Sequence, residues 1–197
     1  MTLNLGEEEE VFENIFAHSK EFDQGLGKIR LGQGSYIVSK DGSGDFATIP
    51  EAIKALPTGG GSIYVKEGTY NNAASIAISK SNVLIEGVGA GTIIVNTTTN
   101  QHVFTIQSKS SIVFRNLKIT AGISATGISM DNATNCIIDK CFFDAGYQAI
   151  AIGGNSSNIL ISNNQITTAF TAILFGDCLK SVINGNALVK SGAIGYT

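Results

Sequence analysis

Paired carboxylates can hydrolyse sugar linkages and esters, because one acts as an acid and the other as a base or nucleophile. This sequence has few of them: the acidic residues after Glu86 are Asp131, Asp139, Asp144 and Asp177. Asp139 and Asp144 stand beside apolar positions of a repeat described below, so we expect both to point outward as solubilising residues. Lys118 and Lys140 are expected on the same outward side. The sequence therefore predicts no catalytic carboxylate pair.

Cysteine and histidine do not have the spacing of a metal site. Cys136, Cys141 and Cys178 are odd in number and lack the short paired spacing of zinc ligands. We expect them to be buried free thiols, since unpaired cysteine is among the most buried residue types. His18 and His102 stand apart, without a cysteine or an acidic pair beside them. No metal and no cofactor is predicted.

The composition is that of a folded chain without a basic surface. Of the 197 residues 43% are hydrophobic and 15% are charged, which excludes a chain that is disordered throughout. The net charge of −3 offers no field for nucleic acid. No apolar run approaches the roughly 20 residues that span a bilayer. Residues 1–10 lack the basic and apolar regions of a secretory signal peptide.

Residues 1–35 differ in charge from the rest of the chain. They contain seven acidic and three basic residues, with an uninterrupted acidic run from Glu7 to Glu10. Val11, Ile15 and Phe16 follow that run at helical spacing. Two interpretations stay open: a solvated acidic arm, or a docking segment that becomes ordered against a partner.

The next segment predicts a strand and then a short capped helix. Residues 36–38 have the character of a strand, and residues 63–65 of another. Between them, Thr48 and Glu51 have the three-residue spacing of a capping box, with Pro50 in the first turn. Pro57 follows the last residue of the apolar face. We expect a helix over residues 48–56.

Beyond the helix the sequence repeats with a period of about 23 residues. A motif of alternating apolar residues begins at Val83 and then at Ile112, Cys136, Ile159 and Ser181. Shorter apolar pairs lie between these copies, for example Ile128 with Met130 and Ile150 with Ile152. Each repeat therefore contains several short strands joined by polar corners.

This repeat is best explained by a coil in which equivalent residues stack. An array of hairpins would need turn dipeptides such as Asn-Gly, and leucine-rich repeats would need a helical half that is absent here. We predict an all-β, right-handed, single-stranded parallel β-helix over residues 36–197, with regular repeats from residue 83 onward. The acidic arm precedes it and helix 48–56 caps it. Asn164 is expected to stack on Asn186 as an amide ladder.

Residues 38–53, VSKDGSGDFATIPEAI, resemble the opening of pectin methylesterases and other pectate-lyase-like proteins. The segments GGSIYVKEGTY over 60–70 and NVLIEGVG over 82–89 fit the same superfamily, and are similar to the β-helix domains of phage tailspikes and alginate epimerases. The resemblance covers residues 36 to about 95 and implies a right-handed β-helix capped by helix 48–56. It does not fix the function, since one fold hosts many.

A later stretch resembles the esterase motifs in part. Residues 141–150, CFFDAGYQAI, are similar to the family's Cys-x-Phe…Gly-Tyr-Gln-Asp-Thr-Leu stretch, which implies that Gln148 is the oxyanion glutamine and that Ala149 replaces the acid–base aspartate. AILFG over 172–176 is similar to Asp-Phe-Ile-Phe-Gly, which puts Ala172 in place of the nucleophilic aspartate. The family's substrate-binding arginine is not found, because the chain has no Arg after Arg115.

The resemblance leaves three candidates for substrate binding. Tyr147 and Gln148 come from the esterase-like stretch. Asp177, in Phe-Gly-Asp-Cys, is similar to part of the polygalacturonase Gly-Asp-Asp motif, but only one aspartate is present.

Because the catalytic positions are empty, the sequence favours a non-catalytic β-helix, a structural or recognition protein of a larger assembly such as a phage or viral tail spike, fibre or virion appendage. We expect a homo-oligomer, such as a trimer, or a larger assembly formed through residues 1–35 and the last coil, at an extracellular or virion surface, with a glycan as a further ligand. The alternative is a polyuronate-active enzyme (an esterase, lyase or epimerase) with an outer groove near Tyr147 and Gln148. A third idea is an adhesin that binds a glycan by shape.

Overall fold

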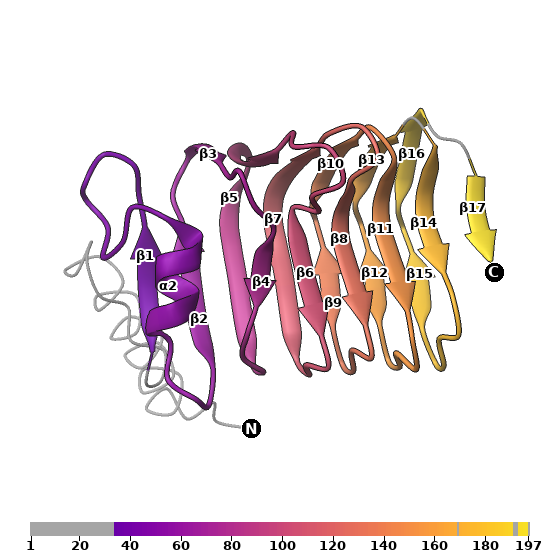
Figure 1. The fold of residues 1–197 in the computed structure, drawn as a ribbon, viewed down its shortest axis with the longest axis horizontal. Coiled ribbons are helices and arrows are strands. Elements are labelled where there is room, and N and C mark those ends of the chain that lie inside the picture. The colour runs from indigo at the N-terminus through magenta and orange to yellow at the C-terminus, as the bar shows by residue number, and fades with distance from the viewer. Residues whose placement is uncertain (1–33, 169, 191–192, 197) are drawn as a thin grey trace, which may run out of the picture.

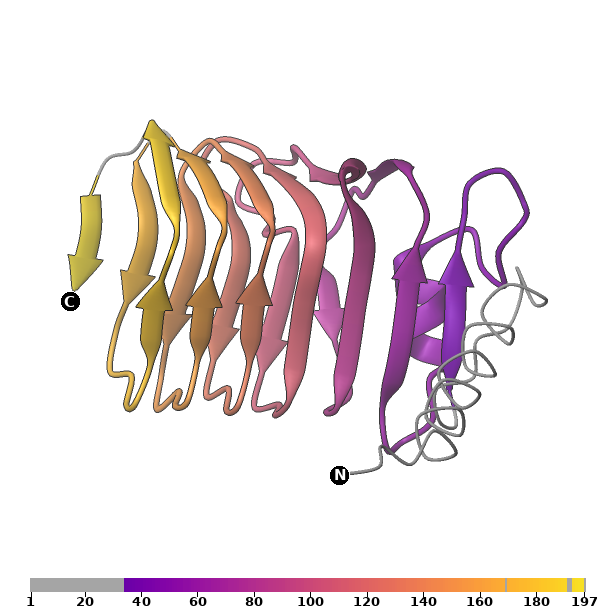
Figure 2. The same cartoon turned by 180° about the vertical axis from the view of Figure 1, so that it is seen from behind.

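The computed structural model describes residues 34–168, 170–190 and 193–196. The described elements are one helix, α2 (Ile49–Ala55), and strands β1 to β17 (Figures 1 and 2). The expectations for the acidic arm fall outside the described residues, apart from Gly34 and Ser35. Ser35 is the first residue of β1, so the first strand begins one residue earlier than predicted.

The strands form two parallel sheets. The first sheet has 11 strands and the second has six. The first sheet contains β1 (Ser35–Val38), β2 (Gly61–Val65), β3 (Gly68–Asn71), β5 (Val83–Asn96), β7 (Ile112–Ala121), β9 (Ile137–Asp139), β10 (Phe142–Ala145), β12 (Leu160–Ser162), β13 (Gln165–Thr168), β15 (Val182–Asn184) and β16 (Ala187–Lys190). The second sheet contains β4 (Ile76–Ile78), β6 (Phe104–Gln107), β8 (Thr126–Asp131), β11 (Gln148–Gly153), β14 (Thr171–Phe175) and β17 (Ala193–Tyr196).

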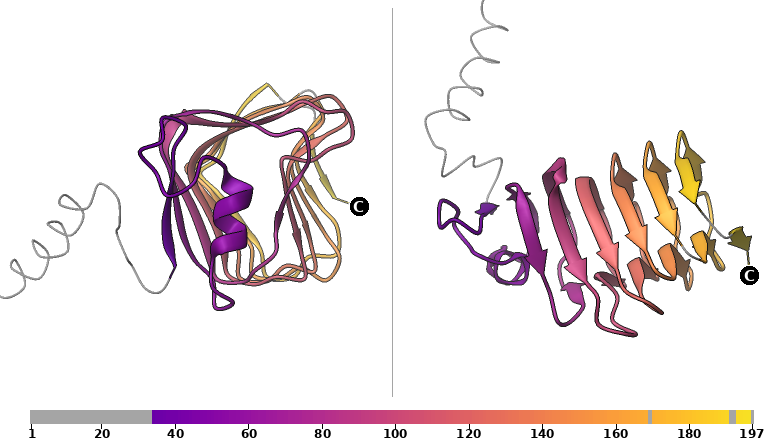
Figure 3. Two further views of the ribbon diagram at one scale, coloured as in Figure 1. Left: turned by 60° about the vertical axis from the view of Figure 1, so that its left-hand side comes forward. Right: turned by 90° about the horizontal axis from the view of Figure 1, so that it is seen from above.

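Each predicted repeat of about 23 residues forms one coil of the structure. Phe114 pairs with Ile138, Ile138 with Ile161, and Ile161 with Ile183, so equivalent residues stack in parallel register. Ile128, Ile150 and Ile173 stack in the same way in the second sheet. Figure 3 shows the coils superposed around one interior. The predicted right-handed parallel β-helix is therefore confirmed.

The first sheet bends, so that each coil has three faces. The first half of β7 pairs with β9 and its second half with β10. At this bend Asn116, Lys140 and Asn163 all have positive φ, between 53° and 55°. A left-handed residue turns the chain sharply, and asparagine tolerates that conformation better than most residues.

Aliphatic and aromatic side chains fill the interior, and α2 closes one end of it. Ile85, Ile138 and Ile161 are completely buried, and the Phe104 and Phe114 rings lie 4.8 Å apart. Thr48 is confirmed as the N-cap: its hydroxyl accepts a hydrogen bond from the Glu51 backbone N–H and donates one to the Glu51 carboxylate, which in a full capping box accepts from the Thr48 backbone N–H instead. Figure 1 shows α2 lying beside β1 and β2.

The last described coil departs from the expected register. The period places Ala193 over Ala172, but β17 pairs Ala193 with Thr171, and the register shifts before Leu174. The amide ladder is confirmed, because Asn164 Nδ2 donates to Asn186 Oδ1 at 2.8 Å. Among the described residues there is no helix long and apolar enough to cross a membrane.

Candidate functional site

The candidate residues Tyr147 and Gln148 lie at the corner that joins the two sheets. Ala145 ends β10, Gly146 and Tyr147 turn the chain, and Gln148 begins β11. A Cβ on Gly146 would lie 2.8 Å from the carbonyl oxygen of Gly122, so the backbones of successive coils approach too closely there for a side chain. This close stacking fixes the corner from which Tyr147 projects.

Tyr147 forms an aromatic pair with Phe170 of the next coil. The two rings are 5.0 Å apart and nearly parallel, at 17°, and their exposed fractions are 37% and 57%. The Tyr147 carbonyl oxygen accepts hydrogen bonds from the Thr168 hydroxyl at 2.8 Å and from the Thr171 N–H at 3.0 Å. The pair is thus an exposed, stacked apolar surface on a hydrogen-bonded turn, and sequence reasoning missed Phe170.

Gln148 lies in a polar column beneath this pair. Its Oε1 accepts from the Thr126 hydroxyl at 3.1 Å, and its side chain is 8% exposed. Thr126 N–H donates in turn to His102 Nδ1 at 3.1 Å. Thr171 is the register partner of Gln148 on the next coil, but the hydrogen-bond partner of Gln148 is Thr126, on the other neighbouring coil.

His102 was also missed, because nothing near it in sequence marks it. Burial lowers its pKa, so the neutral imidazole accepts the Thr126 N–H through Nδ1. The side-chain Oε1 of Gln148 accepts the hydrogen bond from the Thr126 hydroxyl, so the side-chain NH₂ group of Gln148 is left to donate to another acceptor. The column therefore orients Gln148 as a hydrogen-bond donor.

The positions that the esterase resemblance assigns to catalytic aspartates are buried. Ala149 and Ala172 are 0% exposed. A Cβ added at Gly127, the residue that precedes Ile128 as Ala149 precedes Ile150, would lie 3.0 Å from the ring of the core residue Phe143. This column thus faces the interior near Phe143, where a carboxylate would lose its hydration.

A groove of about 310 Å³ lies beside the corner, on the first sheet. Its polar lining includes Asp144, which stands in register between Thr120 and Thr167. Asp144 is exposed, as expected, and Ile123 on the same groove is 77% exposed. The groove therefore places a hydrated carboxylate next to an apolar surface.

The structure does not bring Asp177 to this corner. Asp177 is exposed and follows the end of β14, whereas Phe170 precedes the start of the same strand. The length of the strand separates Asp177 from the aromatic pair.

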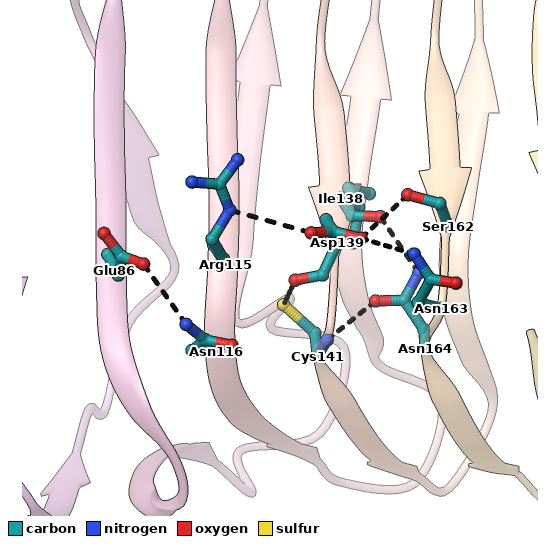
Figure 4. A network of polar contacts seen from close by, with 9 residues as sticks. All are labelled: Glu86, Arg115, Asn116, Ile138, Asp139, Cys141, Ser162, Asn163 and Asn164. Carbon is teal, nitrogen blue, oxygen red and sulfur yellow. Dashed lines mark hydrogen bonds and ion pairs between the residues drawn. The ribbon is translucent and has the colours of Figure 1, made fainter. Parts of the chain in front are cut away.

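Asp139 belongs to a polar network on the outer face of the first sheet (Figure 4). It forms an ion pair with Arg115 at 3.6 Å and accepts hydrogen bonds from Ser162 at 2.9 Å and Asn163 at 3.0 Å. Burial is the largest influence on its pKa and raises it, but these hydrogen bonds together with Lys140 and Arg115 outweigh burial and lower the pKa overall. The expectation of a merely solubilising residue was wrong, because register puts donors on both sides of Asp139.

Two of the three thiols lie inside the coil as expected, whereas the third is only half-buried. Cys136 and Cys141 are buried and free, and Cys178 is half-buried beside Ser181. Among the described residues, no three His, Cys, Asp or Glu side chains gather closely enough to hold a metal ion.

Comparison with known proteins gives one consistent family. A model of the pectinesterase family matches residues 35–168, from β1 through β13. A probable pectinesterase/pectinesterase inhibitor of Brassica napus is 30% identical over 197 aligned residues, covering 89% of this chain and 33% of that protein. The chain spans about a third of the length of the curated relatives it matches.

Solved structures share the fold. A pectin methylesterase variant in complex with a hexasaccharide superposes with a TM-score of 0.58 at 21% identity, over 73% of this chain and 54% of that one. An alginate lyase from Paenibacillus sp. superposes with a TM-score of 0.59 at 18% identity, over 70% of this chain and 54% of that one.

These matches correct the main functional interpretation of the sequence. The interpretation as a non-catalytic structural or recognition protein of a phage or viral appendage is wrong, because the matching family model and the curated relatives are pectinesterases. They support the alternative, in the form of a carbohydrate esterase. The error came from giving Ala149 and Ala172 more weight than the agreement along all of residues 35–168.

Proposed function

Because the chain belongs to the pectinesterase family, we propose that it is a carbohydrate esterase that acts on a methyl-esterified polyuronate such as pectin. The observation that carries this proposal is the family match over residues 35–168, which includes the corner of Tyr147 and Gln148. The chain spans a third of its curated relatives, so the activity of the whole protein is part of the proposal.

We assign the corner of Tyr147, Gln148 and Phe170 as the polysaccharide-binding surface. A sugar ring has an apolar C–H face, and the exposed pair of Tyr147 and Phe170 offers a flat apolar partner to it. The Gln148 NH₂ group is a suitable donor to the ester carbonyl oxygen, whose negative charge grows as water attacks.

Ester hydrolysis also requires a group that accepts the proton of the attacking water. Ala149 and Ala172 offer no such group. Asp144 is the carboxylate that lines the groove beside the corner, and we propose it as the base. Asp144 would take a proton from the water molecule as its oxygen adds to the ester carbon, and would then return that proton to the departing methoxide, which leaves as methanol. The sugar acid formed in this way ionises to its carboxylate.

The test is the release of methanol from methyl-esterified pectin by the purified chain. Tyr147→Ala, Gln148→Ala and Asp144→Asn are each expected to lower the rate by roughly tenfold or more, the usual cost of removing a positioned donor or base. Leu179→Ala, which removes an exposed side chain elsewhere, is the control. If the wild-type chain releases no methanol, the esterase assignment fails; if it does so regardless of these three substitutions, the site lies elsewhere.

A further inference from the structure

A second concave surface lies on the outer face of the first sheet, over the first coils. It has a volume of about 500 Å³ and is formed by β1, β2, β5 and β7. The outward-facing residues used below are Tyr64, Leu84, Glu86, Val88 and Asn116. We call it the first-sheet groove. The corner of Tyr147 belongs to β11 and later coils, so the two surfaces are separate.

The polar centre of the first-sheet groove is Glu86. Its Oε1 accepts from Asn116 Nδ2 at 3.2 Å (Figure 4), and no described residue donates to its second oxygen. Arg115 is the register partner of Glu86, but its Nε is paired with Asp139 at 3.6 Å. Glu86 therefore keeps acceptor capacity that faces the groove.

Tyr64 stands beside Glu86 as its register partner on β2. Burial, and then the charge of Glu86, raises the pKa of the Tyr64 hydroxyl, so the group remains protonated. No described residue bonds to this hydroxyl. The groove thus combines an aromatic ring with an O–H donor that no described residue engages, next to a carboxylate acceptor.

Leu84 and Val88 form the apolar side of the groove, and Val88 is 46% exposed. A ligand that fits has an apolar face, hydroxyl groups at its edge and no negative charge, because Glu86 would repel an anion. A cation is disfavoured by Arg115, whose side chain is 40% exposed on the adjacent coil. A neutral sugar meets all of these conditions.

We propose that the first-sheet groove is a second carbohydrate site, which binds a neutral sugar unit with its ring on Tyr64 and its hydroxyls donating to Glu86. This inference rests on the proposed function in one respect: the neutral sugar is expected to belong to the same class of polysaccharide as the proposed substrate. The chain would hold a polysaccharide at two places: uncharged units on the first sheet, and the esterified uronate at the corner of Tyr147.

Calorimetric titration of the full chain with two probes tests this. Galactotetraose is built from the neutral sugar galactose, and tetragalacturonate from galacturonate, which has a carboxylate in place of the CH₂OH group of galactose. Galactotetraose is expected to bind, with Tyr64→Ala and Glu86→Gln each raising Kd by roughly tenfold. The control Leu179→Ala is expected to change that Kd by less than about twofold. Tetragalacturonate carries a negative charge on every unit, so Glu86 should repel it, and it is not expected to bind the first-sheet groove.

Absence of galactotetraose binding, or binding that ignores both Tyr64→Ala and Glu86→Gln, overturns the proposal. Spermidine binding that Glu86→Gln abolishes, in place of sugar binding, would show a cation site instead. Circular dichroism checks folding, and the nearly isosteric Glu86→Gln carries the test if Tyr64→Ala does not fold. Failure of the esterase assignment is seen separately, as loss of methanol release with galactotetraose binding intact.

Discussion

At the scale of single residues, the stacked coils give buried polar side chains a fixed role. Asn164 shows this most clearly, because it is 1% exposed and its amide is fully used. Its Oδ1 accepts from Cys141 N–H at 2.8 Å, and its Nδ2 donates to Ile138 O at 3.0 Å and to Asn186 Oδ1. One side chain thus connects three successive coils.

Asn164→Ala is therefore expected to destabilise the fold. It leaves the N–H of Cys141 and the carbonyl of Ile138 without their partner, which costs about 2–4 kcal/mol in the free energy of unfolding. Urea denaturation measures the change. Asn155→Ala, at an exposed asparagine, is the control and should stay within about 0.5 kcal/mol. Equal effects of the two substitutions would contradict the ladder's role.

Ala149→Asp tests the orientation of the column that the family resemblance assigns to catalysis. Because Ala149 is 0% exposed, a carboxylate there is expected to cost about 3 kcal/mol or more, or to become protonated. Ala151→Asp, two residues along β11 and partly exposed, is the matched control and should cost little. Thermal unfolding of both variants is the measurement. Equal tolerance at the two positions would mean that residue 149 faces solvent.

At the scale of elements, register decides which polar residues meet. Glu86, Arg115, Asp139 and Ser162 come from β5, β7, β9 and β12, and they stand in one outward column because these strands pair in parallel. The interior columns Ile85, Phe114, Ile138 and Ile161 arise from the same pairing. Parallel pairing therefore places side chains that are one period apart in the sequence next to each other on the sheet.

The outward column makes stability depend on pH through Asp139. Its pKa is below the ordinary 3.8, so its contribution is fully present above that value and is lost as pH falls through the folded-state pKa. We expect the free energy of unfolding to decrease as pH falls below about 4. In Asp139→Asn this decrease should be smaller than in the wild type. Urea denaturation between pH 7 and pH 2.5 measures it, with the exposed Asp144→Asn as control. An unchanged acid limb in Asp139→Asn would refute the assignment.

The sequence was sufficient for the coil but not for the contacts between coils. The apolar columns, the N-cap at Thr48 and the Asn164 ladder were predictable, because period and local spacing determine them. Phe170 and His102 were not, because neither lies in a column that the repeat motif marks: Phe170 acts through a ring contact with Tyr147, and His102 through the backbone N–H of Thr126. The register shift at Thr171 also escaped prediction, since it depends on backbone geometry in the last coil rather than on residue type.

At the scale of the whole molecule, the apolar exposure is uneven. Large hydrophobic residues near the last coils are well exposed, namely Leu179 at 69%, Val182 at 54%, Leu188 at 40% and Val189 at 61%. Clustered exposure of this kind marks surfaces that associate. On the basis of this exposure we propose that the chain associates with itself through its last coils.

Sedimentation velocity over a range of concentrations tests that proposal. The wild-type chain is expected to associate with itself, and Val182→Asp combined with Val189→Asp to shift it toward the monomer by placing charges on the exposed surface. The matched pair Ala77→Asp and Ala90→Asp adds the same charge at exposed positions on the first coils and should leave the association unchanged. A wild-type chain that stays monomeric at every concentration would rule out this role for the patch.

The pairing of each coil with the coils before and after it has a consequence for how the chain reaches its native state. From β8 onward a strand needs only the strand about 23 residues earlier as its template, so contacts are repeated at short range and never require the two ends to meet. Folding can therefore start at the capped end and proceed in the direction of synthesis. A newly made segment could add to the growing edge as soon as one further period has left the ribosome.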